Sequence, residues 1–224
     1  MKRHILILLL VFAFFSASGQ KNIYESNKFN ELSNNHEVLA ILPFLTRLDL
    51  KVDLSKEELR ALEKKEGLAV QNALETYFSK RKEKKKFTVS FQNTKNTNAI
   101  LARNDISYDN IDVYTIKELS EILGVDGIIS GNLDLNILLS KGIPTEFSII
   151  DYFLGQADYG RIGIKISDGK IGKLLWKYEK QITKKTGKNT EDLIDRMMKL
   201  AAKKFPYDRP KRKERRKMRK TNRP

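Results

Sequence analysis

The segment Glu118–Leu133, ELSEILGVDGIISGNL, places the end of a helix directly before a buried strand. Thr115 and Glu118 have the spacing of a capping box, in which each side chain satisfies a backbone amide of the first helical turn. Gly124 stands where this helix ends, because glycine adopts the left-handed conformation of a C-cap. The apolar run after Asp126 predicts a strand. A helix joined so closely to a buried strand favours an α/β fold.

Further patterns extend this unit in both directions. HEVLAILPFL, from His36, predicts a first buried strand, and a capping box of Ser55 and Glu58 begins a long helix that reaches a basic run. KFTVSFQ alternates apolar and polar residues and predicts a second strand, and TKNTNAILARNDI predicts a short helix. YGRIGIKIS and KLLWKYEKQI predict a hairpin whose turn begins at Asp168 and Gly169. NTEDLIDRMMKLAAKKF predicts a final amphipathic helix.

The order of these patterns, β-α-β-α-α-β-β-β-α, is typical of an α/β domain. We predict one domain with a single mixed sheet packed by helices, a C-terminal antiparallel hairpin and a final amphipathic helix. Residues 137–157 show no clear period and receive no assignment. Structural roles in turns and close packing are expected for Gly124, Gly127, Gly131, Asp168, Gly169 and Trp176.

The first 19 residues have the composition of a secretory signal peptide. Lys2, Arg3 and His4 precede the apolar run ILILLLVFAFF, and the small residues SASG follow it. The run is shorter than the ~20 residues that span a bilayer, although an N-terminal anchor remains an alternative. We expect cleavage after Gly19 and a periplasmic or extracellular mature protein. The chain contains no cysteine, which excludes disulfides and lipid attachment to a cysteine.

Two segments account for the positive charge of the mature chain. The whole chain has a formal net charge of +15, of which Lys2 and Arg3 belong to the signal peptide. Residues 80–86, KRKEKKK, carry +5 and residues 208–224 carry +8, so the remainder is neutral. Contacts with an anionic surface are therefore expected at Lys80, Arg81, Lys82, Lys84, Lys85, Lys86, Lys211, Arg212, Lys213, Arg215, Arg216, Lys217, Arg219 and Lys220.

For an exported chain, the expected partners of these segments are an anionic membrane or polysaccharide surface, or an acidic envelope protein. Each basic residue near an anionic membrane adds about 1 kcal/mol, which salt screens. Nucleic acid suits an exported protein less well. A solvated tail without a dedicated partner remains open, since blocks of like charge are usually disordered.

These features divide the chain into four parts: a signal peptide (1–19), a polar leader segment (20–36), the α/β domain (37–207) and a disordered basic tail (208–224). The leader segment is polar and has no clear period. We expect no transmembrane span after signal cleavage, and a homo-oligomer remains open.

Residues suited to catalysis or metal binding are scarce. His36 is the one histidine of the mature chain, and it precedes a strand without a nucleophile motif. The glycines of GVDGIISGN and GKIGK lack the lysine and hydroxyl of a phosphate-binding loop. Asp105, Asp109 and Asp112 could offer oxygens to calcium, but their spacing matches no EF-hand, and aspartates also favour turns. We predict no catalytic, cofactor-binding or metal-binding residue; a carboxylate-dependent enzyme remains an alternative.

The series ILPF, ELSEILGVDGIISGNL and ISDGKIGKLLWKYE resembles the amino-terminal domain of TolB and the periplasmic domain of curli secretion-channel lipoproteins. The resemblance extends over residues 37–205. It departs from the curli-channel family in lacking a lipobox cysteine and membrane hairpins: residues 45–54 are too few, and residues 137–157 do not alternate. The TolB propeller is absent as well.

The resemblance implies a non-enzymatic envelope protein with an accessory role in assembly, secretion or envelope maintenance. Such a protein would act through protein or surface contacts, with the basic tail against an anionic surface or an acidic partner. A binding module for an anionic polymer, either polysaccharide or nucleic acid, is the alternative. The identity of the partner, the pathway and the oligomeric state do not follow from the sequence.

Overall fold

The computed structural model describes residues 23–50, 52–83, 87–142, 159–183, 187–201 and 205–207. The expected signal peptide, Lys84 to Lys86, residues 143–158 and the basic tail lie outside the described residues. No helix among the residues with described positions is both long and apolar enough to cross a bilayer.

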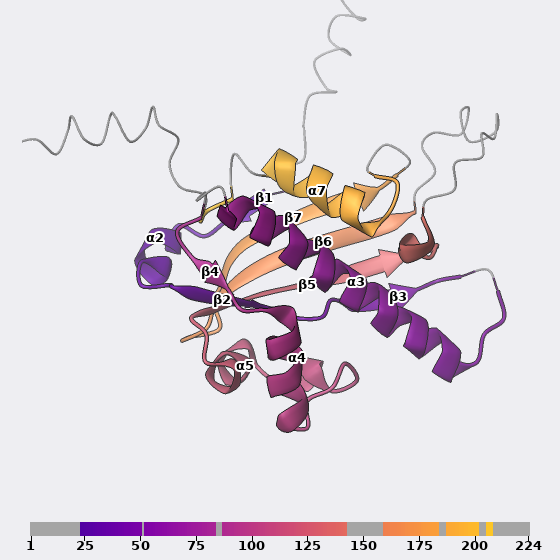
Figure 1. Cartoon of the computed structure of the whole chain (residues 1–224), viewed down its shortest axis with the longest axis horizontal. Helices are drawn as coiled ribbons and strands as arrows, with labels where there is room; N and C mark the ends of the chain where they lie inside the picture. The colour runs from indigo at the N-terminus through magenta and orange to yellow at the C-terminus, as the bar shows by residue number, and fades with distance from the viewer. Residues whose placement is uncertain are drawn as a thin grey trace, which may run out of the picture.

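A mixed sheet of seven strands forms the centre of the described chain (Figure 1). Its order is β1-β7-β6-β5-β2-β4, and β3 pairs with β5 beyond the end of β2. β2 and β3 run parallel to β5, and β4 runs parallel to β2, whereas β6, β7 and β1 are antiparallel to their neighbours. The bounds are β1 Ile23–Glu25, β2 Val38–Ile41, β3 Leu45–Leu48, β4 Ser90–Phe91, β5 Gly127–Leu135, β6 Gly160–Asp168 and β7 Leu174–Ile182.

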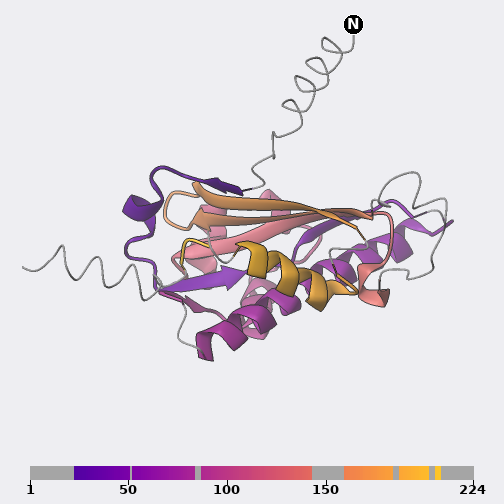
Figure 2. The same cartoon turned by 90° about the horizontal axis from the view of Figure 1, so that it is seen from above.

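Helices pack on both faces of this sheet. α3 and α7 lie side by side on one face, which Figure 2 shows from above, and α4 and α5 pack on the other. Alternate residues of β2 and of the position after it belong to different cores: Leu39 and Ile41 face α3 and α7, while Ala40 and Leu42 face α4 and α5. This arrangement confirms the predicted fold class. The helices are α2 Phe29–Ser33, α3 Lys56–Glu83, α4 Thr94–Arg103, α5 Ile116–Leu123 and α7 Thr190–Ala201, with 3-10 turns η2 Ile111–Val113 and η3 Leu139–Lys141.

Both predicted capping boxes are present. The hydroxyl of Ser55 accepts a hydrogen bond from Glu58 N at the start of α3, and Thr115 pairs with Glu118 in the same way before α5. The carboxylates of both glutamates accept hydrogen bonds in return, which lowers their pKa values. Gly124 ends α5 with a φ of 64°, as the pattern predicts.

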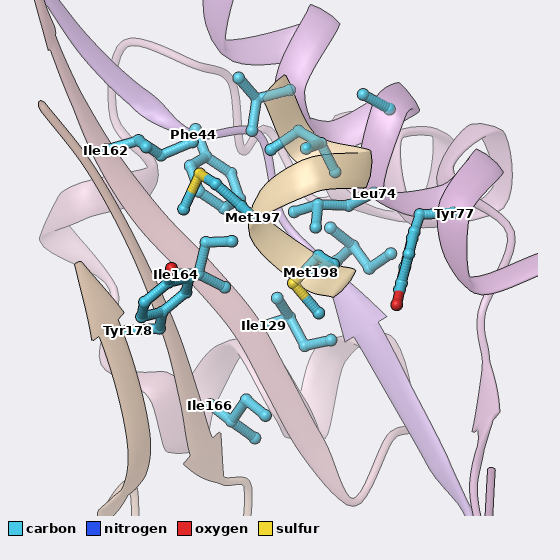
Figure 3. Close-up of a cluster of buried hydrophobic side chains, with 14 of the residues drawn as sticks. Phe44, Leu74, Tyr77, Ile129, Ile162, Ile164, Ile166, Tyr178, Met197 and Met198 are labelled. Atoms are coloured by element: carbon cyan, nitrogen blue, oxygen red, sulfur yellow. The ribbon is translucent and has the colours of Figure 1, made fainter. Parts of the chain in front are cut away.

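The larger core joins the hairpin to α3 and α7. Figure 3 shows Met197 and Met198 of α7 between Leu74 of α3 and the apolar row of β6, which includes Ile164. Leu193, Ile194, Met197 and Met198 are all buried. Burial of each such side chain contributes about 1.5–3 kcal/mol, so these residues fix α7 on the sheet.

A close approach at Gly131 shapes the middle of the sheet. A Cβ atom there would lie 2.1 Å from the carbonyl oxygen of Gly163 and 2.2 Å from the ring of Phe44. No larger residue fits without moving backbone. Phe44 occupies this space because the chain bends between β2 and β3, and both strands pair with β5.

The structure differs from the sequence-based expectations in three places. Residues 23–25 and 29–33 of the expected leader segment form β1 and α2, and β1 pairs with β7. β3, at residues 45–48, had no predicted counterpart, because four residues are too few for a clear alternation. The predicted second strand is limited to β4 at residues 90–91.

Candidate functional site

The two basic segments are joined to described residues that lie beside each other. Run 80–86 ends two residues before Thr88, and the basic tail begins directly after Tyr207. The backbone N–H of Thr88 donates a hydrogen bond to the carbonyl oxygen of Tyr207 at 3.0 Å, and its hydroxyl lies 3.3 Å from the same oxygen. The points at which the two segments are attached are therefore close in space, although they are more than a hundred residues apart in sequence.

An aromatic cluster supports this junction. The rings of Phe78 and Phe91 are stacked with centroids 4.2 Å apart, and Phe205 lies 5.4 Å from Phe78 and 5.5 Å from Phe87. The Arg81 guanidinium lies 5.5 Å from the ring centroid of Phe87. Such contacts stabilise by about 0.5–1.5 kcal/mol each, so they hold the last turn of α3 against the segment before the tail.

A chain of three polar side chains holds Tyr207 in place. Its hydroxyl lies 2.6 Å from His36 Nδ1, and His36 Nε2 lies 3.0 Å from Asp168 Oδ1. The side chains of His36 and Asp168 are each only 5 % exposed. These three hydrogen-bonded side chains connect the start of β2, the β6–β7 turn and the residue before the basic tail.

Burial raises the pKa of Tyr207, and the negative charges of Asp168 and Asp126 raise it further. The phenol is therefore protonated at neutral pH and is available as a donor. In one consistent arrangement, His36 Nδ1 accepts from the Tyr207 hydroxyl and Nε2–H donates to Asp168. Both ring nitrogens are occupied in this arrangement.

Backbone hydrogen bonds position Asp168 and its neighbours. Asp168 Oδ2 accepts from Ile171 N at 2.8 Å, which closes the β6–β7 turn. Asp126 Oδ2 accepts from the backbone of Glu37 and Val38 at 2.8 and 2.9 Å, and its carbonyl oxygen accepts from Gly169 N. The motif LGVDG therefore fastens the start of β2 and the hairpin turn.

A groove of about 780 Å³ opens beside this chain, lined by Ser120, Lys117, Lys170, His36, Asp126 and Asp168 among others. The Ser120 hydroxyl is buried and has no hydrogen-bond partner among the described residues. It cannot receive activation from His36 while both imidazole nitrogens bind elsewhere. The arrangement is suited to anchoring three segments and not to a Ser–His–Asp reaction.

The aspartate group that could have offered calcium ligands is differently arranged. Asp109 Oδ1 accepts a hydrogen bond from Arg60 Nε at 2.6 Å. Asp105 has a φ of 57° at a turn. Within the described ranges, no group of three or more acidic, histidine or cysteine residues is arranged to hold a metal ion.

The structure describes only some of the basic residues that are expected to contact an anionic surface. Lys80 is exposed, Arg81 is half-buried against aromatic rings, and Lys82 belongs to α3. Lys84, Lys85 and Lys86 and the tail residues Lys211, Arg212, Lys213, Arg215, Arg216, Lys217, Arg219 and Lys220 lie outside the described residues.

The six residues with expected structural roles lie in or beside the sheet. Gly124 ends α5, and Gly127 and Gly131 belong to β5. Asp168 and Gly169 form the turn, where a Cβ on Gly169 would lie 2.7 Å from Ser120 Oγ. Trp176 is fully buried in β7.

The connection of His36 to Tyr207 was missed from the sequence. The two residues are 171 positions apart, and neither belongs to a motif. The one available indication was that residues 20–224 contain a single histidine, shortly before a buried strand.

No protein-family model matches the chain, and no curated protein sequence matches it. Several solved structures share parts of its arrangement. Lipoprotein GNA1162 from Neisseria meningitidis is 12 % identical, with a TM-score of 0.44, over 75 % of this chain and 98 % of that one.

The C-terminal domain of LpoB from Salmonella enterica is 9 % identical, with a TM-score of 0.32, over 66 % of this chain and 82 % of that one. PelC from Paraburkholderia phytofirmans, a dodecamer, is 8 % identical, with a TM-score of 0.30, over 72 % and 86 %. At these values the similarities carry no functional argument. The resemblance to TolB and the curli secretion-channel proteins stays a prediction.

Proposed function

We propose that this chain is an exported, non-enzymatic envelope protein that binds an anionic surface through its two basic segments acting together. The observation that carries the proposal is the Thr88–Tyr207 hydrogen bond, which brings the attachment points of both segments together. Between them the segments carry +13, which equals the net charge of the mature chain. A neutral domain whose excess charge belongs to two segments with neighbouring attachment points is suited to surface attachment.

An accessory role in assembly, secretion or envelope maintenance is part of the proposal, and it is supported by the signal-peptide composition of residues 1–19. The surface that we favour is an anionic lipid membrane. Each basic residue near such a surface contributes about 1 kcal/mol, so even a few residues from each segment give a stable attachment.

Co-sedimentation with vesicles tests this function. The mature chain and a chain that ends at Tyr207 are mixed with phosphatidylglycerol vesicles and, as a control, with neutral phosphatidylcholine vesicles. We expect the full chain to bind the anionic vesicles at about 0.05 M salt and to be released by about 0.5 M, because salt shortens the range of the attraction. Equal binding by the shortened chain, or binding that salt does not change, would contradict the proposal.

Binding to an anionic polymer is measured in the same experiment with heparin and DNA. Tight binding to either polymer without binding to anionic vesicles would favour the alternative function. A steep linear fall of log K with log salt is expected for phosphate contacts.

A further inference from the structure

A second surface lies along the earlier part of α3, and none of its lining residues belongs to the basic segments 80–86 and 208–224 or to the Thr88–Tyr207 contact, which we call the basic junction. Two adjoining hollows of about 490 and 430 Å³ lie along this helix. Lys64 and Leu68 line both, so the hollows form one groove. We name it the α3–α4 groove; its lining includes Ala61, Lys64, Lys65, Leu68, Leu101 and Ile106.

The floor of the α3–α4 groove is apolar. Pro43, Leu101, Ile106 and Ile111 contribute buried side chains, and Leu68 is half-buried above them. The apolar surface that still meets water includes that of Leu68 and Ala61, and covering it would stabilise a complex. The groove can therefore accept apolar side chains from a partner.

The rim formed by α3 carries unpaired positive charge. Lys64 and Lys65 are exposed, and neither forms an ion pair or a hydrogen bond with a residue of described position. Arg60, one turn earlier, is paired with Asp109 and Glu63. The opposite wall offers one carboxylate, Asp105, so the groove has a net positive charge. Negative charge in the occupant would complement the α3 rim.

Buried hydrogen bonds fix the walls of the groove. The amides of Gln71 and Asn98 donate to each other at 3.0 Å and join α3 to α4, and Gln71 also donates to the carbonyl of Ile41 at 2.7 Å. Gln71 is fully buried. Since these bonds are already formed, an occupant would not have to order the walls, and this lowers the free-energy cost of binding.

The middle of α3 lies against the chain between β2 and β3. A Cβ atom on Gly67 would be 2.0 Å from the carbonyl oxygen of Phe44 and 3.1 Å from the Tyr108 ring. The Tyr108 hydroxyl accepts from Thr46 N at 2.8 Å. Close packing and a hydrogen bond therefore hold this side of the groove in place.

We infer that the α3–α4 groove binds an amphipathic helix of a partner protein that carries carboxylates beside its apolar stripe. Apolar side chains at helical spacing would enter the floor, as in other helix-in-groove complexes. The carboxylates would meet Lys64 and Lys65. This site does not involve the basic junction, so it can be correct even if the proposed surface attachment is wrong.

Synthetic helical peptides test the inference by fluorescence anisotropy with the full mature chain at about 0.3 M salt, where screening limits attraction to the basic tail. The probe is a peptide of about 15 residues with leucines at i, i+4, i+7 and i+11 and flanking glutamates. A second peptide keeps the glutamates and replaces the leucines by serine. A third keeps the leucines and replaces the glutamates by lysine.

We expect the glutamate–leucine peptide to bind more tightly than both others. Lys64→Glu should weaken its binding about fivefold, because one attraction becomes a repulsion, and Leu68→Ser should weaken it about tenfold. Lys56→Glu is the matched control, because Lys56 is an exposed residue of the same helix that lines neither hollow, and it should change the Kd by less than about twofold.

Three results would overturn the inference: no measurable binding of the glutamate–leucine peptide, equal binding of the serine or lysine peptide, or an unchanged Kd for Lys64→Glu. Thermal unfolding of each variant checks that the fold is intact, because Lys64 is exposed and Leu68 is half-buried.

Discussion

The hairpin end of the sheet and the α3–α4 groove are both hollowed, but they differ in how their polar groups are used. At the hairpin end, Asp126, Asp168 and His36 all bind other parts of the chain, and the Ser120 hydroxyl, which has no partner among the described residues, is buried and uncharged. In the groove, Lys64 and Lys65 bind nothing of described position. A polar group that is already satisfied serves the fold, whereas an unsatisfied charge at an apolar groove is available to a partner. The presence of a hollow does not by itself distinguish a structural region from a binding site.

The largest expected effect concerns the wall of the groove. Gly67→Ala should lower the free energy of unfolding by about 4 kcal/mol, because the added methyl group overlaps the backbone of Phe44. Urea unfolding measures the change. Ala69→Gly, on the same helix, is the control and should cost about 1 kcal/mol from helix propensity alone. A loss of similar size in both variants would mean that α3 does not pack against Phe44 as described.

The next largest effect lies at the hairpin end. His36→Phe keeps a ring beside Tyr207 but removes two hydrogen bonds and leaves the buried Asp168 carboxylate without its imidazole partner. We expect a loss of about 3 kcal/mol in urea unfolding. If the loss stays below about 1 kcal/mol, the hydrogen bonds among Asp168, His36 and Tyr207 do not anchor the segment that ends at Tyr207.

Tyr207→Phe tests the Tyr207–His36 hydrogen bond separately from the His36–Asp168 hydrogen bond. It removes one hydroxyl and should cost about 1 kcal/mol at neutral pH. Because the pKa of Tyr207 is raised in the folded state, the unfolded chain loses this proton first as pH rises above 10. Stability of the unmodified chain should therefore fall above pH 10, by up to about 1.4 kcal/mol per pH unit from this group.

That alkaline loss should be smaller in Tyr207→Phe, since the variant has no hydroxyl to titrate at this position. Urea unfolding from pH 9 to about 11.5 measures both chains, and lysine deprotonation affects them equally. Parallel stability curves for the two proteins would show that the Tyr207 hydroxyl titrates normally.

The smallest effect is expected on the groove surface. Lys64→Glu should change the free energy of unfolding by less than about 0.5 kcal/mol, because an exposed lysine without a partner contributes little to stability. Thermal unfolding beside the unmodified chain measures it. A larger loss would show that Lys64 serves the fold, and the contrast between the two hollows would disappear.

Local patterns predicted the fold well, because capping boxes and glycine stops act over a few residues. Thr115 with Glu118, Ser55 with Glu58, and Gly124 each stand where the sequence indicates. β3 was missed since its four residues are defined by pairing with β5 and not by a pattern of their own.

The candidate sites were harder to predict because they depend on tertiary contacts. His36 meets Tyr207 across 171 positions, and the attachment points of the two basic segments meet at the Thr88–Tyr207 hydrogen bond. Asp168 was expected as a turn residue, but its bond to His36 had no indication in the sequence. In the groove, Lys64 and Arg60 look alike as helix cations until the structure shows that only Arg60 is paired.

The central claim is that hydrogen-bonded groups at the hairpin end hold the fold, whereas the two basic segments make the proposed contacts with an anionic surface. The most direct test measures unfolding and vesicle binding together for His36→Phe and for the chain that ends at Tyr207. We expect His36→Phe to lose about 3 kcal/mol of stability and keep its salt-sensitive binding to anionic vesicles, and the shortened chain to show the reverse. Loss of vesicle binding in folded His36→Phe, or full binding by the shortened chain, would contradict the account.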